Sequence, residues 1–160
     1  MIEIKQKIKK AIKEHGYIII RIDSKKILKN NDLAINYISF TVGMSKNYGG
    51  PELIFVGERE KDISRFLDKY IFYKKIDITT KEIVSFTNLG DENAKHGIVE
   101  HHIANKFASQ LFEYYKEEYP ERKPPEVIWI GRKTKNYPFH NFLNGSNDIN
   151  LEKIVSNSIN

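Results

Sequence analysis

Residues 34–57, AINYISFTVGMSKNYGGPELIFVG, decide the fold. In the first part of this stretch apolar and polar side chains alternate, with Phe40 and Val42 on one face and Ser39 and Thr41 on the other. A period of two residues is typical of a strand whose second face meets solvent or a cleft. The segment SKNYGGP interrupts the pattern, and ELIFVG then forms a second apolar run. The stretch therefore predicts two strands joined by a glycine-containing turn.

The remaining elements follow from apolar spacing on either side of this stretch. A helix repeats its apolar side chains every three or four residues, whereas a buried strand is a short run rich in β-branched residues. Residues 60–74 show the helical spacing most clearly, with Ile63, Phe66, Leu67 and Tyr70 on one stripe. The predicted elements are a basic amphipathic helix at 1–16, strands at 17–22, 34–44, 52–57 and 126–131, helices at 60–74 and 99–119, a strand or strand pair at 76–86, and a polar loop at 88–97.

This order of elements predicts the fold class. Helices and strands do not alternate regularly as they do in a parallel α/β fold, and 160 residues suit one domain. We therefore expect a single α+β domain with a mostly antiparallel mixed sheet and helices packed on one face. The α+β domain is predicted to span residues 17–143, after the helix at 1–16 and before a polar tail at 144–160 with at most a short helix.

The amino-acid composition excludes several kinds of site. The chain has no cysteine, which removes disulfide frameworks, thiol nucleophiles, iron–sulfur clusters and thiolate-bound zinc. Lysines interrupt the apolar positions of the first helix, so neither a signal peptide nor a membrane-spanning helix is predicted there. We expect a cytoplasmic protein without a membrane partner.

Lysine is concentrated near the N-terminus. The chain has a net charge of +5, but residues 1–30 hold eight Lys and one Arg against three acidic residues, a net of +6. The other 130 residues are therefore nearly neutral, at −1. Such a basic segment favours a nucleic-acid partner bound through its phosphates, although A/T-rich codons also explain much of the lysine.

Two patterns that often mark a nucleotide or a metal are incomplete in this chain. The glycines at 43–50 match neither a dinucleotide-binding nor a phosphate-binding loop, because no helix is predicted to follow them. His96, His101 and His102 lack the spacing of four residues that places two metal ligands on one helix face. We expect no metal and no cofactor, and we leave Glu100 with His101 or His102 open as an acid–base pair.

Residues 129–140, WIGRKTKNYPFH, concentrate side chains that bind rings and phosphates. They include the only tryptophan, Trp129, together with Arg132, Tyr137 and His140. This mixture of aromatic and cationic groups stacks on bases and pairs with phosphate. A core strand followed by a hairpin is the alternative interpretation.

Two parts of the chain are similar to a known family. Residues 40–44 (FTVGM) and 50–57 (GPELIFVG) resemble the F-x-Y-T-x-G-L and H/G-P-E-L-x-x-x-G signature of the bacterial and phage domain of unknown function family 4262. Residues 127–129 (VIW) and 137–139 (YPF) are similar to its Q-x-x-W-P-D and G-x-F-P-W segment.

The resemblance covers residues 16–142 and implies an intracellular α+β domain with a site between these two motifs. It implies no activity, because none is attached to the family. The chain departs from the pattern where Gly131 replaces the Asp of W-P-D and Phe139 replaces the last Trp, so any role of that Asp is lost here.

These observations predict a binding site for a small anionic, nucleotide-like ligand. Glu52 would hold a ribose or base edge, Arg132 a phosphate, and Trp129 or Tyr137 a ring. Sequestration or cleavage of a signalling nucleotide in defence against phage is the function that we expect. The predicted ligand-binding residues are Thr41, Gly43, Gly50, Pro51, Glu52, His102, Trp129, Arg132, Tyr137 and His140.

Two other functions remain open from the sequence. One is an RNA- or DNA-binding module that uses residues 1–30, and the other is a protein-contacting inhibitor or immunity factor. Self-association as a homo-oligomer is compatible with each of the three functions.

Overall fold

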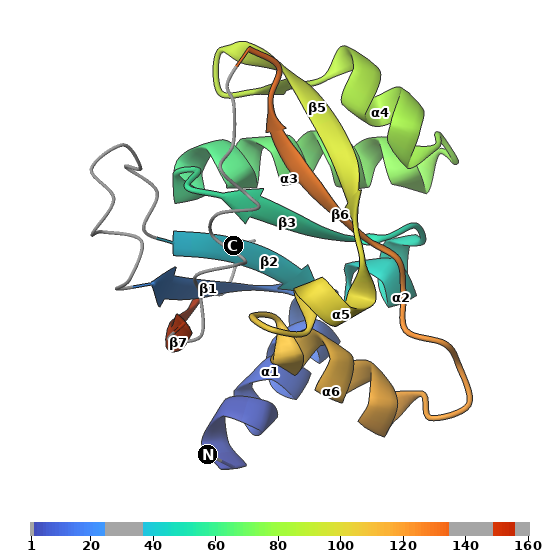
Figure 1. Cartoon of the computed structure of the whole chain (residues 1–160). Coiled ribbons are helices and arrows are strands. Elements are labelled where there is room, and N and C mark those ends of the chain that lie inside the picture. The colour runs from blue at the N-terminus through green and yellow to red at the C-terminus, as the bar shows by residue number, and fades with distance from the viewer. Residues whose placement is uncertain (1, 25–36, 135–148, 156–160) are drawn as a thin grey trace.

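The fold is built on one mixed sheet of seven strands in the order β4-β5-β6-β3-β2-β1-β7 (Figure 1). The computed structural model describes residues 2–24, 37–134 and 149–155. Neighbouring strands are antiparallel except for β3 and β6, which are parallel. This arrangement confirms the predicted α+β class and the mostly antiparallel sheet. The strands are β1 (Ile18–Ser24), β2 (Tyr37–Val42), β3 (Glu52–Val56), β4 (Asn88–Leu89), β5 (Glu92–Val99), β6 (Val127–Arg132) and β7 (Ile149–Val155).

Helices cover both faces of the sheet, so the prediction that they pack on one face is wrong. On one face Ile8 and Ile12 pack against Ile20, and on the other Phe66 packs against Ile19 and Phe55. Successive residues of a strand point to opposite faces, and an isoleucine run therefore feeds both cores. The helices of the first face are α1 (Ile2–His15), α5 (His101–Ala104) and α6 (Ser109–Glu118), and those of the second are α2 (Met44–Tyr48), α3 (Glu60–Lys75) and α4 (Thr80–Phe86).

This double cover changes the surroundings of β2. The alternation in its sequence predicts one face toward solvent or a cleft, yet Ser39 and Thr41 are buried as completely as their apolar neighbours. β3 pairs with β2 through Phe40 and Ile54, as the central stretch predicts. The turn between them contains the short helix α2, which the sequence does not predict.

Three predicted elements between residues 76 and 119 are wrong. The strand predicted at 76–86 is helix α4, whose first turn is capped by the Thr79 hydroxyl accepting from the Glu82 N–H at 3.2 Å. The polar loop predicted at 88–97 is the β4–β5 hairpin, with Gly90 at a φ of 67° in the turn. The helix predicted at 99–119 is the end of β5 followed by α5 and α6, because Val99 and Phe107 reach one core from different elements and only imitate a helical period.

The segments at the two ends of the chain belong to the same fold. α1 contributes Ile8 and Ile12 to the core, and β7 pairs with β1 between residues 149 and 155. The predicted boundaries at 16 and 143 therefore do not separate structural units, and the tail contains a strand instead of a short helix. Among the described residues, no helix is both long and apolar enough to cross a membrane.

Candidate functional site

The predicted ligand-binding loop surrounds a buried carboxylate. The Glu52 side chain is 0% exposed at the start of β3. The Thr41 hydroxyl of β2 donates to its Oε1 at 2.6 Å and also accepts from the Leu53 N–H at 2.9 Å. The Tyr115 hydroxyl of α6 donates to Oε2. Three elements are therefore tied to one side chain.

The backbone at the start of α2 completes this carboxylate network. The N–H groups of Gly43 and Ser45 donate to Glu52 Oε2 at 3.0 and 3.1 Å, and that of Met44 donates to Oε1 at 3.2 Å. Gly43 has a φ of 99°, a conformation that glycine adopts without strain and that aims these N–H groups inward. Five donors therefore occupy the two oxygens, and the carboxylate has neither the exposure nor the free acceptor capacity to hold a ribose.

Burial raises the pKa of Glu52, while the hydrogen bonds from Thr41, Tyr115 and the α2 backbone oppose that shift. A raised pKa means that the folded chain keeps a proton at pH values where the unfolded chain has released it. We therefore expect the Glu52 contribution to stability to be complete below the unfolded-state pKa and to be lost as the pH rises through the folded-state pKa. Urea denaturation between pH 4.5 and 8 gives the free energy of unfolding of the wild type and of Glu52→Gln, whose side chain does not titrate. The difference between the two free energies should shrink as the pH rises. A difference that is constant or that grows with pH would contradict the assignment.

Arg132 is also committed inside the protein. Its guanidinium contacts Glu58 Oε1 at 3.1 Å, Asp62 Oδ2 at 3.2 Å and Asp91 Oδ1 at 3.0 Å. Glu58 and Asp62 are almost fully buried, and the Arg59 Nε also reaches Asp62 at 3.1 Å. Counted over the described residues in this carboxylate cluster, three acids against two arginines sum to −1. The cluster does not attract the phosphate that the sequence predicts at Arg132.

Those of the other predicted residues that the structure describes lie at separate places in the fold. Gly50 packs against the α3–α4 junction, where a Cβ would meet the Thr80 Oγ1 at 2.9 Å, and Pro51 is buried beside it. His102 is exposed, with its Nδ1 3.6 Å from Glu100 Oε1. Trp129 lies over Gly97. Tyr137 and His140 lie outside the described residues.

Among the described residues, no three His, Asp or Glu side chains are placed together to hold a metal ion. His101 points away from His102 and places its Nε2 2.8 Å from the Pro125 carbonyl oxygen. Glu100, His101 and His102 are not among the lining residues of the three cavities described for this part of the chain.

Comparison with known proteins gives no further guide. No protein-family model, curated protein or solved structure matches this chain. The resemblance to family 4262 therefore stays a prediction, and the function has to be argued from the surface of the molecule.

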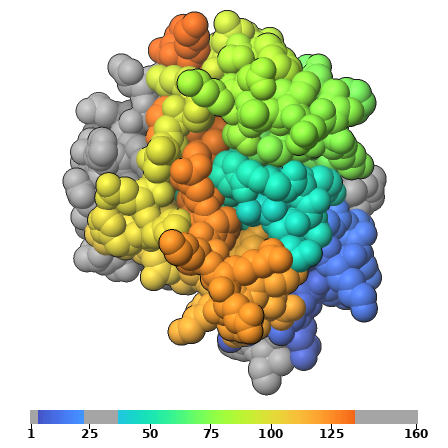
Figure 2. All heavy atoms as spheres, turned by 90° about the vertical axis from the view of Figure 1, so that its right-hand side faces the viewer, coloured from blue at the N-terminus to red at the C-terminus, as the bar shows by residue number. Residues whose placement is uncertain are grey.

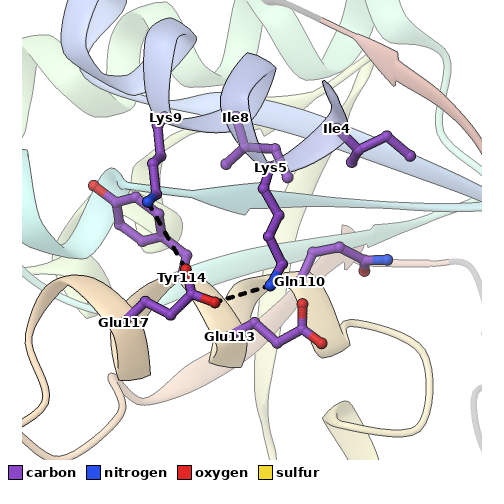
Figure 3. A pocket seen from close by; sticks show the side chains of 8 residues that line it. All are labelled: Ile4, Lys5, Ile8, Lys9, Gln110, Glu113, Tyr114 and Glu117. Carbon is purple, nitrogen blue, oxygen red and sulfur yellow. Dashed lines mark hydrogen bonds and ion pairs between the residues drawn. The ribbon is translucent and has the colours of Figure 1, made fainter. Parts of the chain in front are cut away.

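A pocket that the sequence analysis missed lies between α1 and α6, which are in direct contact (Figure 2). It has a volume of about 160 Å³. Figure 3 shows that α1 contributes side chains from above and α6 from below. The apolar lining comes from Ile4, Ile8 and Tyr114, and the polar lining from Lys5, Lys9, Gln110, Glu113 and Glu117.

Ion pairs close one side of this pocket (Figure 3). Lys5 Nζ lies 2.9 Å from Glu117 Oε2, and Lys9 Nζ lies 3.8 Å from Glu117 Oε1 and 3.2 Å from Glu118 Oε2. The hydrogen bond to Glu117 raises the pKa of Lys5, and the same bond lowers the pKa of Glu117. The charged residues that line the pocket are two lysines and two glutamates, Glu113 and Glu117, so their charges sum to zero. Glu118, which pairs with Lys9, lies outside this lining.

The sequence identifies the residues that α1 contributes to this pocket but not those of α6. Ile4 and Ile8 belong to the apolar stripe of the first helix, but the helix predicted at 99–119 gives no indication of which of its faces meets that stripe. In the structure Gln110, Glu113, Tyr114 and Glu117 follow one another at three and four residues along one face of α6. Only the packing of α6 beside α1 brings the two sets together.

The same ion pairs reduce the basic surface of α1. Lys5 and Lys9 are engaged by α6, while Lys7, Lys10 and Lys13 are exposed. The remaining lysines of the predicted nucleic-acid segment, at 25, 26 and 29, lie outside the described residues.

An aromatic patch lies on the opposite side of the sheet, on α3 and α4. Phe72, Ile76 and Phe86 are exposed, and Tyr73 joins the two phenylalanines through edge-to-face contacts at 5.3 and 4.9 Å. Next to them is a cavity of about 320 Å³. Contiguous apolar surface of this kind is common at interaction sites of proteins. The third function considered from the sequence, contact with another protein, stays a prediction.

Proposed function

We propose that this domain binds a small amphipathic molecule in the α1–α6 pocket. The carrying observation is the apolar surface of Ile4, Ile8 and Tyr114, which forms a concave floor under a rim of charged side chains. Ligand sites commonly combine such a floor with a few polar groups that fix orientation. The proposal retains small-ligand binding, the class of function predicted from the sequence. It places the site between α1 and α6 instead of between residues 41–52 and 129–140.

The charged side chains of the pocket favour a neutral or cationic ligand over the anionic nucleotide expected from the sequence. The charges that line the pocket sum to zero, and both of its lysines already contact glutamates. An anionic nucleotide would have to break those pairs and then face Glu113 as well. A neutral or cationic molecule avoids both costs.

The pocket supports binding without turnover. Its lysines and Glu117 are held in ion pairs, and burial raises the pKa of Tyr114, so this phenol stays protonated at neutral pH. Sequestration or sensing fits this lining better than cleavage.

A fragment screen followed by amide chemical-shift mapping tests the proposal. We expect ring-sized amphiphiles to shift resonances of α1 and α6, and Ile4→Trp to abolish these shifts because the indole fills the pocket. Lys10→Trp is the matched control, since it places the same side chain on the exposed side of α1. At a concentration about 100 times the Kd, a true ligand stabilises the fold by about 2.7 kcal/mol.

Thermal denaturation shows first that both tryptophan variants are folded. The proposal fails if no fragment shifts α1 and α6, or if Ile4→Trp and Lys10→Trp bind fragments equally well.

A further inference from the structure

We propose that the α1–α6 pocket selects an amine that carries one aromatic ring, an inference that rests on the proposed function. Size is the first argument. The pocket measures about 160 Å³, and a protein cavity of about 150 Å³ holds one benzene molecule. One ring therefore fills the space between Ile4, Ile8 and Tyr114, whereas a nucleotide is too large.

The second argument is a buried hydrogen-bond acceptor without a partner. The Gln110 Oε1 is buried and makes no hydrogen bond, the single such side-chain atom in the described part of the chain. A buried amide oxygen of this kind gains most from a ligand that brings an N–H or O–H donor. Gln110 lines the pocket below Ile4 (Figure 3), so its amide is within the same site as the apolar floor.

Glu113 supplies the third argument, a carboxylate for a cation. It is exposed, lies one turn along α6 from Gln110, and makes no hydrogen bond or ion pair with a described residue. Lys5 does not neutralise it by direct contact, because the Lys5 ammonium is drawn to Glu117 at 2.9 Å. A ligand ammonium next to Glu113 would find one acceptor directly, and a second when the Gln110 side chain turns its buried Oε1 toward the pocket, while its ring would face the Tyr114 side.

Three probes of one shape separate the contributions of ring and charge. Phenethylamine is a cation, 2-phenylethanol is its neutral analogue, and 3-phenylpropanoate carries the opposite charge. We expect the amine to bind about two- to fivefold more tightly than the alcohol, the range for an ion pair with an exposed carboxylate such as Glu113. The carboxylate should bind more weakly than the alcohol because it meets Glu113. Isothermal titration calorimetry with the full chain gives the three affinities.

Variants of the two acceptors test their separate roles. Glu113→Gln should remove most of the preference for the amine, about two- to fivefold, and leave the affinity for 2-phenylethanol unchanged. Glu121→Gln is the matched control, since this exposed glutamate lies outside the pocket. Gln110→Leu should weaken both the amine and the alcohol, because the apolar side chain accepts no hydrogen bond.

The outcomes distinguish the ligand class from the function. Equal affinity for all three probes, or a preference for the carboxylate, overturns selection of an amine and leaves the pocket as a ligand site. An amine preference that survives in Glu113→Gln also overturns it. If none of the probes binds, the inference fails, while shifts of α1 and α6 by other fragments would keep the proposed function.

Discussion

Glu52→Ala is expected to lower the free energy of unfolding by about 3–5 kcal/mol, the range found when one partner of a buried charged network is removed. The substitution leaves the Thr41 and Tyr115 hydroxyls and the backbone N–H groups of 43–45 without their acceptor in a dry interior. Each buried donor left unpaired costs about 1–3 kcal/mol, and a cavity adds to that cost. Relaxation around the site reduces the sum to the stated range.

Urea denaturation followed by circular dichroism measures this loss. Glu126→Ala is the matched control. The Glu126 side chain is exposed, and its backbone carbonyl, which the substitution keeps, accepts the Glu52 N–H at 2.9 Å. We expect that control to change stability by less than about 0.5 kcal/mol. Tyr115→Phe removes one donor and leaves four, so its loss should be about 1–2 kcal/mol. If Glu52→Ala resembles Glu126→Ala, Glu52 does not organise the fold.

Arg132→Met is the second substitution with a large expected effect, again about 3–5 kcal/mol. The methionine fills much of the same space but leaves Glu58 and Asp62, at 2% and 3% exposure, without the guanidinium between them. Asp91 contributes little to this loss, because its side chain is exposed and screened by solvent. The carboxylate cluster would then hold two like charges in the interior.

The control and the rescue for this prediction use the same cluster. Arg59→Met removes an exposed arginine that also contacts Asp62, and we expect a loss below about 1 kcal/mol. Adding Glu58→Gln and Asp62→Asn to Arg132→Met should restore most of the stability, because no uncompensated charge then remains buried. A triple variant as unstable as Arg132→Met would show that packing, and not charge, causes the loss.

Both predictions concern residues that the sequence marks as ligand-binding. Thr41, Glu52 and Arg132 were selected because their types hold sugars and phosphates, and the structure shows that they hold the protein's own groups. A carboxylate next to backbone N–H groups has the same chemistry whether the partner is a ligand or a strand end. The sequence carries no direct measure of burial, and burial decides between the two.

The pocket between α1 and α6 shows the same limit from the other side. Ile4 and Ile8 are recognisable as an apolar stripe, and Glu113 and Glu117 as ordinary surface glutamates, but no pattern connects residues more than 100 positions apart. The helix predicted at 99–119 does not indicate which face of α6 meets α1. Its apparent apolar period includes the end of β5, which is not part of a helix. The position of the pocket follows from helix packing alone.

The sequence by itself determined the strands at its centre, the helix at 60–74, the α+β class and the absence of cysteine chemistry. These features are local, since apolar period and residue type act within a few positions of each other. Three other features became visible only in the folded chain: the cover on both faces of the sheet, the internal partners of Glu52 and Arg132, and the position of the open apolar surface. Those properties depend on contacts between distant segments, which form when both faces of the sheet are covered by helices.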